Sequence, residues 1–218
     1  MVSKMEVEKE NKNATNTNKD LISVVRKDDE GAENLNPAQT TQGNNAHEQI
    51  LYKDNIMTIV IDKAKINGRD FEFLKIEEND AVVVLAVIDN HIILVKQYRP
   101  ASDKYFYELP AGHIGENESP ENAAIREMQE ETGYTPKKVS LMFKGYPIPG
   151  TNTMMVSFYL AEGEDLSKGT ANPEPDEDIS VVKVSLEDAM KMIRSGEITD
   201  LKTIACLLYY YYIFKNGR

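Results

Sequence analysis

Residues 112–134 read GHIGENESPENAAIREMQEETGY, and this stretch determines most of what the sequence says about structure. Within it, Ser119-Pro120-Glu121 supplies a capping hydroxyl, a proline at the first helical position and an acid in the first turn. Gly133 suits the end of a helix because glycine adopts left-handed backbone angles without strain. The stretch therefore predicts a helix from about Pro120 to Thr132.

Acidic side chains share one face of this predicted helix. Glu127, Glu130 and Glu131 are spaced i, i+3 and i+4, so they project from the same side. An apolar stripe lies beside them, made of Ala124, Ile125 and Met128. We expect the acids to face outward and the stripe to pack against the rest of the domain.

The acidic face predicts a divalent metal site. Like charges within one helical turn repel each other, and a hard cation removes that conflict. Mg²⁺ takes a few carboxylates from a protein and completes its octahedron with water and substrate phosphates. We therefore predict Mg²⁺, with Mn²⁺ as the alternative. Arg126 lies within reach of Glu130 and near Glu118, so we assign it the task of orienting carboxylates.

Glutamate-rich helices with interspersed arginines are common as solvated surfaces, and that interpretation stands for any single acid here. It fails for the pattern as a whole, because all of its members would have to occur together by chance. The members are Gly112, Glu118, Arg126, Glu127, Glu130, Glu131 and Gly133.

The stretch resembles a Nudix box, the signature of Mg²⁺-dependent hydrolases that cleave nucleoside diphosphates linked to another group. Flanking runs resemble the ADP-ribose pyrophosphatase branch of that family: Gln97-Tyr98-Arg99-Pro100, Tyr107 to Gly112, and Pro149-Gly150. The resemblance covers about residues 50–218. It implies an α/β fold, a Nudix-type α/β/α sandwich with a mixed β-sheet and a preceding antiparallel strand region, and it implies a homodimer.

The resemblance also implies roles for individual residues. Glu127, Glu130 and Glu131 correspond to metal ligands, and the Ala111 carbonyl completes that site. Arg99 corresponds to a pyrophosphate contact, Glu108 to a contact on the nucleotide side, and Gly150 to a further substrate contact. The alternatives are a surface arginine at a strand end for Arg99 and a plain ion pair for Glu108.

The general base is harder to place. Many relatives carry a glutamate a few residues after Pro-Gly, but Pro149 to Met154 contains none. The acids Glu174, Asp176, Glu177 and Asp178 lie before the last predicted strand. We predict Glu177 as the base, which together with Glu130 and Arg126 makes the catalytic set. The alternative is a mobile acidic loop without a role.

ADP-ribose, cleaved to AMP and ribose 5-phosphate, is the expected substrate. Three alternatives remain: another nucleotide sugar or dinucleotide, a catalytically silent ADP-ribose sensor, and an interaction protein that acts through its tail and its Tyr209–Tyr212 run. Because stacking tolerates any base, the aromatic candidates for holding it cannot be ranked. They are Tyr52, Phe71, Phe73, Tyr105 and Phe106.

Composition limits the rest of the chain. Residues 1–49 are polar and contain no aromatic residue, which predicts a disordered tail before a single Nudix domain at 50–218. A net charge of −11 argues against a nucleic-acid surface and against anionic membranes. Neither a signal peptide nor a membrane span is visible, so we expect a cytoplasmic protein. Cys206, the only cysteine, lies in an apolar run and should be buried.

Short apolar runs separated by turn residues predict the remaining elements. Strands are predicted at 55–61, 70–76, 81–87, 91–97, 139–146, 154–161 and 179–184, with turns at 66–68 and 89–90. A polar loop is predicted at 163–178. Two helices are predicted at the end of the chain, at about 186–194, capped by Ser185, and about 200–215.

Overall fold

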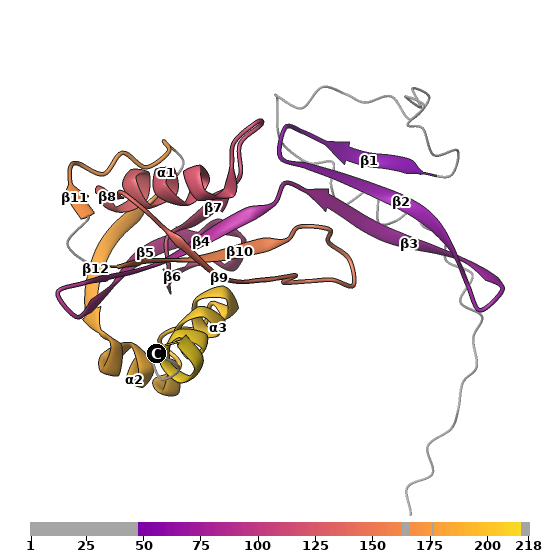
Figure 1. The fold of residues 1–218 in the computed structure, drawn as a ribbon. Coiled ribbons are helices and arrows are strands. Elements are labelled where there is room, and N and C mark those ends of the chain that lie inside the picture. The colour runs from indigo at the N-terminus through magenta and orange to yellow at the C-terminus, as the bar shows by residue number, and fades with distance from the viewer. Residues whose placement is uncertain (1–47, 163–165, 176, 215–218) are drawn as a thin grey trace, which may run out of the picture. The chain divides into compact units, whose positions relative to one another are not determined.

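A seven-stranded mixed β-sheet with helices on both faces is the main element of the structure (Figure 1). The structure is a computed structural model that describes residues 48–162, 166–175 and 177–214. The strands of this sheet are β4 (Ala81–Ile88), β5 (His91–Arg99), β6 (Lys104–Glu108), β7 (Ala111–His113), β9 (Ser140–Gly145), β10 (Val156–Glu162) and β12 (Ile179–Ser185).

The strand order is β12-β5-β4-β10-β9, with β6 paired to β5 and β7 paired to β4. β4 and β10 run parallel, from the pair Ala81 and Val156 to the pair Val87 and Glu162. All other pairs in this sheet are antiparallel. A parallel pair needs a crossover connection, and the chain between β4 and β10 contains the helix predicted from the acidic stretch.

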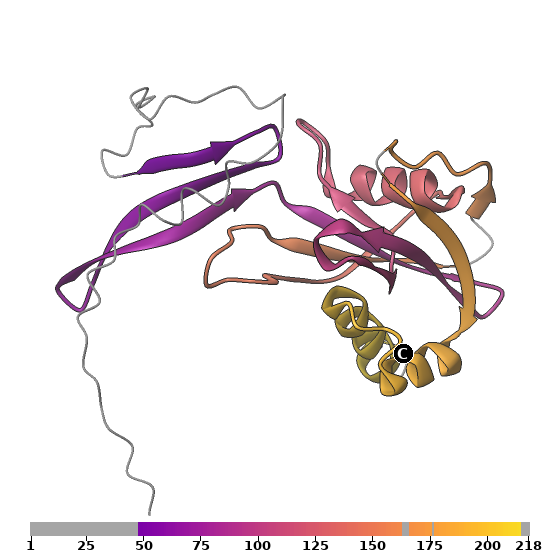
Figure 2. The same cartoon turned by 180° about the vertical axis from the view of Figure 1, so that it is seen from behind.

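Helix α1 (Pro120–Thr132) covers one face of the sheet, and α2 (Leu186–Ser195) and α3 (Leu201–Tyr209) cover the other (Figures 1 and 2). β4 explains this layering because its side chains alternate between the two faces. Val82 and Val84 pack with α1, whereas Val83 and Leu85 pack with α3. A strand buried on both sides must be apolar throughout, as residues 81–86 are.

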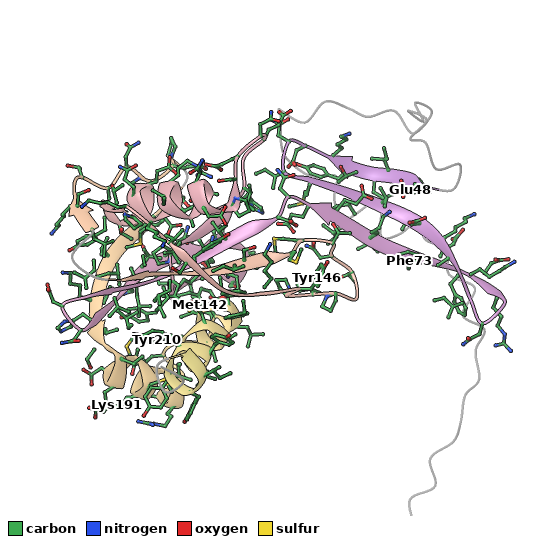
Figure 3. All side chains as sticks on the ribbon, in the orientation of Figure 1. Glu48, Phe73, Met142, Tyr146, Lys191 and Tyr210 are labelled. Atoms are coloured by element: carbon green, nitrogen blue, oxygen red, sulfur yellow. The ribbon has the colours of Figure 1, made fainter. Side chains whose placement is uncertain are left out.

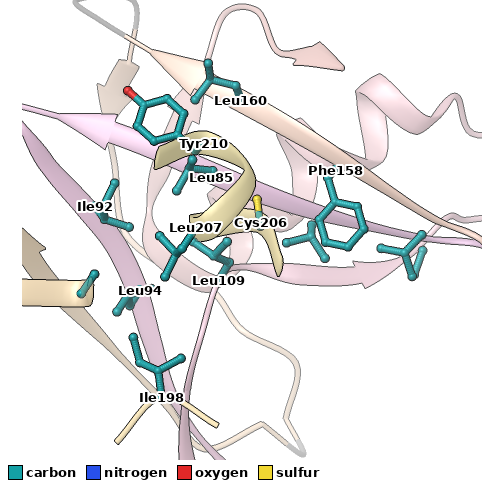
Figure 4. Packing of buried hydrophobic residues seen from close by; sticks show 14 residues of the cluster. Leu85, Ile92, Leu94, Leu109, Phe158, Leu160, Ile198, Cys206, Leu207 and Tyr210 are labelled. Atoms are coloured by element: carbon teal, nitrogen blue, oxygen red, sulfur yellow. The ribbon is translucent and has the colours of Figure 1, made fainter. Parts of the chain in front are cut away.

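The core beneath α3 joins the sheet to the end of the chain (Figure 4). Leu85, Ile92 and Leu94 of the sheet pack with Leu207 and with Cys206 of α3. Both of these α3 side chains are fully buried, and burial raises the pKa of the Cys206 thiol well above its usual range. The prediction that Cys206 is a buried apolar side chain is confirmed.

A second, three-stranded antiparallel sheet precedes the main one. It consists of β1 (Gln49–Lys53), β2 (Met57–Ile66) and β3 (Arg69–Glu78). Several of its apolar side chains are exposed, among them Leu51, Phe71 and Phe73, the last labelled in Figure 3. The homodimer stays a prediction. The exposed apolar side chains of this sheet are the candidate surface for its interface.

The fold class predicted from sequence is confirmed, including the antiparallel strand region before the main sheet. The predicted strands correspond to β2, β3, β4, β5, β9, β10 and β12. The predicted turns at 66–68 and 89–90 contain residues in the left-handed region, namely Asn67, Gly68, Asp89 and Asn90. Helix α2 begins after Ser185, whose side chain accepts a hydrogen bond from the Asp188 amide, as predicted.

Five short strands were not predicted: β1, β6, β7, β8 (Tyr134–Pro136) and β11 (Leu166–Lys168). β11 lies within the predicted polar loop and pairs with β8, so that part of the prediction was wrong. The last predicted helix divides into α3 and a π-helical turn at Tyr210–Phe214. Tyr210 is buried while Tyr212 is exposed, so the tyrosine run contributes both to the core and to the surface.

The predicted disordered tail at 1–49 lies outside the described residues, except for Glu48 and for Gln49, which begins β1. The predicted domain at 50–218 therefore stays a prediction at its ends. Within the described part of the chain, no helix is long and apolar enough to cross a membrane. The cytoplasmic location stays a prediction.

Candidate active site

Helix α1 has the bounds and caps that its sequence predicts. The Ser119 side chain accepts a hydrogen bond from the Asn122 amide at 3.2 Å. Gly133 ends the helix in the left-handed region, with φ at 76°, and its amide donates to the Gln129 carbonyl. The glycine is required for a second reason, because a Cβ there would lie 2.8 Å from the Gly169 carbonyl oxygen. The end of α1 is therefore closely covered by the segment around Gly169.

Arg126 is the centre of a partly buried ionic network beside α1. Its Nε and Nη2 donate to the two carboxylate oxygens of Glu118 at 2.9 and 2.8 Å. Its Nη1 donates to Glu127 at 2.7 Å and to Glu130 at 2.9 Å. These bonds raise the pKa of Arg126 and lower that of Glu118. The predicted contacts of Arg126 are confirmed, whereas its catalytic role stays a prediction.

Glu131 does not face outward, so the expectation that all three acids do was wrong. Only 2% of its surface is exposed, and its carboxylate accepts a hydrogen bond from the Ala111 amide of β7. Burial raises the pKa of Glu131 well above its usual range, and the charges of Glu177 and Glu127 add to that rise. The helical spacing correctly predicted that the three acids share one face of α1. β7 covers the part of that face that Glu131 occupies.

One buried oxygen atom at this site is suited to a hard cation. Oε2 of Glu131 is buried and has no hydrogen-bond partner among the described residues. An unpartnered carboxylate oxygen is costly inside a protein unless it is protonated or ligates a cation. Burial also raises the pKa of Glu127, and Glu130 and Glu177 contribute to that rise.

The carboxylates of Glu127, Glu130 and Glu131 do not point toward a common metal position in this structure. Within the described residues, no three histidine, cysteine, aspartate or glutamate side chains form a group that could hold a metal ion. Arg126 accounts for this arrangement, because it binds Glu127 and Glu130 while Glu131 lies beneath β7. Ligation by all three acids would therefore require small side-chain rotations, since the backbone of α1 already places them on adjacent turns.

Gly112 allows Glu127 to lie against β7. A Cβ at this position would come within 2.1 Å of Glu127 Oε1 and 2.2 Å of its carboxyl carbon. A Cβ makes no non-bonded contact so close, so any other residue at position 112 would move the carboxylate. The glycine that begins the acidic stretch is therefore required by the site rather than by a turn.

We expect Gly112→Ala to lower activity strongly while leaving the fold intact. The group displaced is the flexible end of Glu127, so the backbone need not move, but the carboxylate loses its place beside Glu131. Misplacing one reacting group by about 1 Å can cost about 10²-fold in rate. Turnover and thermal unfolding measured together test this, with Gly145→Ala as control because nothing lies within 4 Å of a Cβ there. Wild-type activity in Gly112→Ala would contradict the requirement.

Arg99 and Glu108 form a bidentate ion pair at the edge of the site. Arg99 Nε and Nη2 donate to the two oxygens of Glu108 at 2.9 and 2.7 Å. Glu108 is buried, whereas 40% of the Arg99 side chain is exposed. The charge of Glu131 contributes to the raised pKa of Arg99, which places the guanidinium near the acids of α1. The structure thus brings Arg99 to the site, with Glu108 as its buried ion-pair partner.

The predicted base lies close to these acids. The charge of Glu177 contributes to the raised pKa of both Glu131 and Glu127. Its Oε1 accepts from Gln97 Nε2 at 3.3 Å and its Oε2 from the Glu174 amide at 3.0 Å. Asp176, another acid of this loop, lies outside the described residues. Sequence reasoning missed Gln97, whose only signal was its position in the resemblance run before Arg99.

The structure does not bring Gly150 to the acids of α1 in the described contacts. It lies in an exposed turn whose neighbour Thr151 accepts a hydrogen bond from the Ile76 amide of β3 at 2.8 Å. Asn152, just beyond, donates to Glu78, whose other oxygen pairs with His113 Nε2 at 2.9 Å. The predicted substrate contact of Gly150 stays a prediction. The His113 carbonyl accepts a hydrogen bond from Arg126 Nη2 at 3.0 Å.

Known proteins resemble the chain in sequence and in structure. It is 38% identical over 165 residues to the ADP-ribose pyrophosphatase of Bacillus subtilis (strain 168), covering 75% of this chain and 89% of that protein. It is 35% identical over 125 residues to a GDP-mannose pyrophosphatase of Enterobacter sp. (strain 638), covering 54% and 65%. A solved ADP compounds hydrolase shares the fold, with a TM-score of 0.68, 20% identity, and coverage of 78% of this chain and 96% of that one.

The family assignment rests on the sequence profile as well as on these relatives. Residues 78–205 match the NUDIX domain, a range that begins at the end of β3 and ends within α3. It includes the whole main sheet, α1 and the loop that carries Glu177. With the acidic stretch in place on α1 and a relative of 38% identity along most of its length, the chain belongs to the Nudix hydrolase family.

Proposed function

We propose that the protein hydrolyses the diphosphate bond of ADP-ribose, or of a related nucleoside diphosphate sugar, with Mg²⁺ or Mn²⁺ as cofactor. ADP-ribose would give AMP and ribose 5-phosphate. The observation that carries this proposal is the buried, unpartnered Oε2 of Glu131 beside Glu127 and Glu177. The likeness to the Bacillus subtilis ADP-ribose pyrophosphatase supports the substrate.

The metal ligands in this proposal are Glu127, Glu130 and Glu131, with the main-chain carbonyl of Ala111. A metal bound there supplies neutralisation of the diphosphate charge and a water of lowered pKa. Arg126 holds the carboxylates of Glu127 and Glu130 on the correct side of α1, and Glu118 fixes the other edge of its guanidinium. Arg126 thus keeps both carboxylates near the positions from which small rotations would bring them to a metal.

Arg99 binds the diphosphate in this proposal. Its guanidinium uses Nε and Nη2 to bond Glu108, which fixes the plane of the group and leaves its exposed edge for phosphate oxygens. Glu108 therefore acts here as the buried counter-ion of Arg99, and Lys202 Nζ lies 3.7 Å from the same carboxylate. Its predicted contact with the nucleotide itself is a separate proposal, because Glu108 is buried and both of its oxygens accept hydrogen bonds from Arg99.

Glu177 takes the proton of the attacking water. As the water oxygen forms its bond to phosphorus, the bridging P–O bond breaks and the bridging oxygen leaves with the second phosphate. Each product then carries a phosphate monoester. A carboxylate suits this step because a positioned glutamate can accept a proton from a water whose own pKa a bound metal would lower.

A substrate panel tests the proposal. The full chain is incubated with Mg²⁺ or Mn²⁺ and with ADP-ribose, GDP-mannose, other nucleotide sugars and dinucleotides. Phosphate released by an added phosphatase then reports each exposed monoester. We expect ADP-ribose to be cleaved fastest, and EDTA to abolish cleavage. Binding of ADP-ribose without turnover of any compound would overturn the hydrolase proposal in favour of a sensor.

GDP-mannose is the second candidate substrate, because a relative with that activity in its name is 35% identical to this chain. The machinery assigned above contacts only the diphosphate, so it does not distinguish the two. A higher kcat/KM for GDP-mannose than for ADP-ribose in the same panel would change the substrate and leave the residue roles as they are.

A further inference from the structure

The loop that carries Glu177 is attached to the catalytic helix at one end. The Gly169 amide donates to the Gly133 carbonyl at 2.7 Å, and the Asn172 amide donates to the Glu130 carbonyl at 2.8 Å. Both acceptors belong to the C-terminal end of α1, where carbonyls lack helical partners. The early part of the loop is therefore anchored by main-chain bonds that no side-chain substitution removes.

The other end is attached to the hairpin of β5 and β6. Gln97 Nε2 donates to Glu177 at 3.3 Å, and the Tyr105 hydroxyl donates to the carboxylate of Asp178. The main-chain amide of Tyr98 donates to the Asp178 carbonyl at 3.1 Å, a bond that no side-chain change at this position removes. Two adjacent loop residues are therefore held by side chains from both strands of one hairpin.

These contacts fix the Glu177 carboxylate in direction as well as in place. Its Oε1 accepts from Gln97 and its Oε2 from the Glu174 amide at 3.0 Å, so the plane of the carboxylate is set from two sides. Gln97 is only 3% exposed, and a buried amide needs such a partner. Ordering a free glutamate side chain costs conformational entropy, and here that cost is met before substrate binds.

We propose that the side chains of Gln97 and Tyr105 are positioning residues, a hairpin latch that holds Glu177 where it can take the proton of the attacking water. The proposal rests on the role of Glu177 proposed above. Neither latch residue touches the acids of α1 in the described contacts, so they act through Glu177 and Asp178 alone.

Tyr105 provides the cleaner test of the latch. Tyr105 is 49% exposed, so the hydrogen bond of its hydroxyl, rather than packing, is what its removal tests. The hydrogen bond to Asp178 raises the pKa of the Tyr105 hydroxyl, which remains a donor at neutral pH. Tyr98, whose ring centroid lies 5.4 Å away, donates its own hydroxyl to Asp103 within the hairpin at 2.7 Å. Tyr98→Phe therefore removes the same kind of bond without touching the loop.

We expect Tyr105→Phe to lower kcat about tenfold with KM within about twofold of wild type, because a general base contributes about 10²–10⁴-fold and part of that is lost when it is mobile. Gln97→Met, which keeps the length of the side chain and removes its donors, should do the same. Tyr98→Phe should stay within about twofold of wild type. Equal losses in Tyr105→Phe and Tyr98→Phe would overturn the latch.

A double-mutant cycle separates the latch from its premise. In a Glu177→Gln background, Tyr105→Phe should cause no further loss, because the group it positions no longer accepts a proton. The same tenfold loss in that background would show that Tyr105 acts elsewhere, which overturns the latch. Full activity of Glu177→Gln alone would overturn the base, and the latch with it.

Hydrogen exchange tests the latch without any substrate. The Glu177 amide donates to the Glu174 carbonyl at 3.0 Å, so its exchange rate reports whether that turn is closed. We expect the amide to exchange several times faster in Tyr105→Phe than in wild type and Tyr98→Phe. Unchanged exchange would overturn the latch even if the enzyme proved active on every compound, and faster exchange would support it even if none were cleaved.

Discussion

Glu131→Gln is expected to lower turnover by about 10³-fold or more while the protein stays folded, since the variant keeps the shape of the side chain and loses a charged metal ligand. The buried Oε2 of Glu131 would become an amide group that cannot ligate Mg²⁺ as a carboxylate does. Steady-state kinetics at saturating Mg²⁺ measure the loss. Glu116→Gln is the control, because Glu116 is exposed in the turn before α1. Activity within tenfold of wild type would contradict the metal assignment.

The same variant should be more stable than wild type when metal is removed at neutral pH or above. Burial raises the pKa of Glu131 well above its ordinary value of 4.5, so the folded state retains this proton to higher pH than the unfolded state. The stability that the group contributes is therefore complete below pH 4.5 and is lost as pH rises through the raised pKa. Glutamine does not ionise and loses nothing over this range.

Thermal unfolding in EDTA measures this effect. We expect Glu131→Gln and wild type to differ little at pH 4, and the variant to unfold at the higher temperature at pH 8. Added Mg²⁺ should stabilise wild type far more than the variant, because only a state that binds the ion gains from it. A constant difference between the two proteins at both pH values would contradict the pKa assigned to Glu131.

Arg126→Lys is expected to lower activity by about 10–100-fold, a loss typical of residues that orient metal ligands. Lysine keeps the positive charge but cannot bond Glu118, Glu127 and Glu130 at once, as the planar guanidinium of Arg126 does. The measurement is turnover as a function of Mg²⁺ concentration.

Excess metal should distinguish this variant from the ligand variant. Raising Mg²⁺ should restore much of the activity of Arg126→Lys, because its carboxylates remain and only their arrangement is lost. It should not restore Glu131→Gln. Lys191→Arg is a surface control, since Lys191 pairs with Glu187 and Asp188 on the exposed face of α2. If Arg126→Lys lost activity to the same extent at every Mg²⁺ concentration, the orienting role would be wrong.

The catalytic helix could be predicted from sequence because its signals are local. Ser119, Pro120 and Gly133 act within one turn of the helix ends, so their neighbours in sequence are also their neighbours in space. The reach of Arg126 to Glu130 follows from the same spacing. Periodicity also gave the apolar side of α1, where Ala124 and Met128 are buried.

The features of the site that could not be predicted from sequence depend on strand pairing. Glu131 is buried because β7 lies over it, and β7 is a three-residue strand whose register with β4 no local pattern reveals. The Arg99 and Glu108 pair likewise requires the antiparallel register of β5 with β6. The position of Glu177 beside Gln97 depends on the pairing of β12 with β5, in which Ile179 lies opposite Gln97.

The parallel pairing of β4 with β10 leads us to expect an order of assembly. This ladder joins Ala81 to Val156, so α1 and its acids lie within the chain segment that the ladder closes. Closing a long segment costs entropy before any long-range contact repays it, and such pairings form slowly. A nascent chain that ends before β10 would therefore carry every ligand proposed for the metal and still lack a formed site. Mg²⁺ affinity should arise only once β10 has joined the sheet.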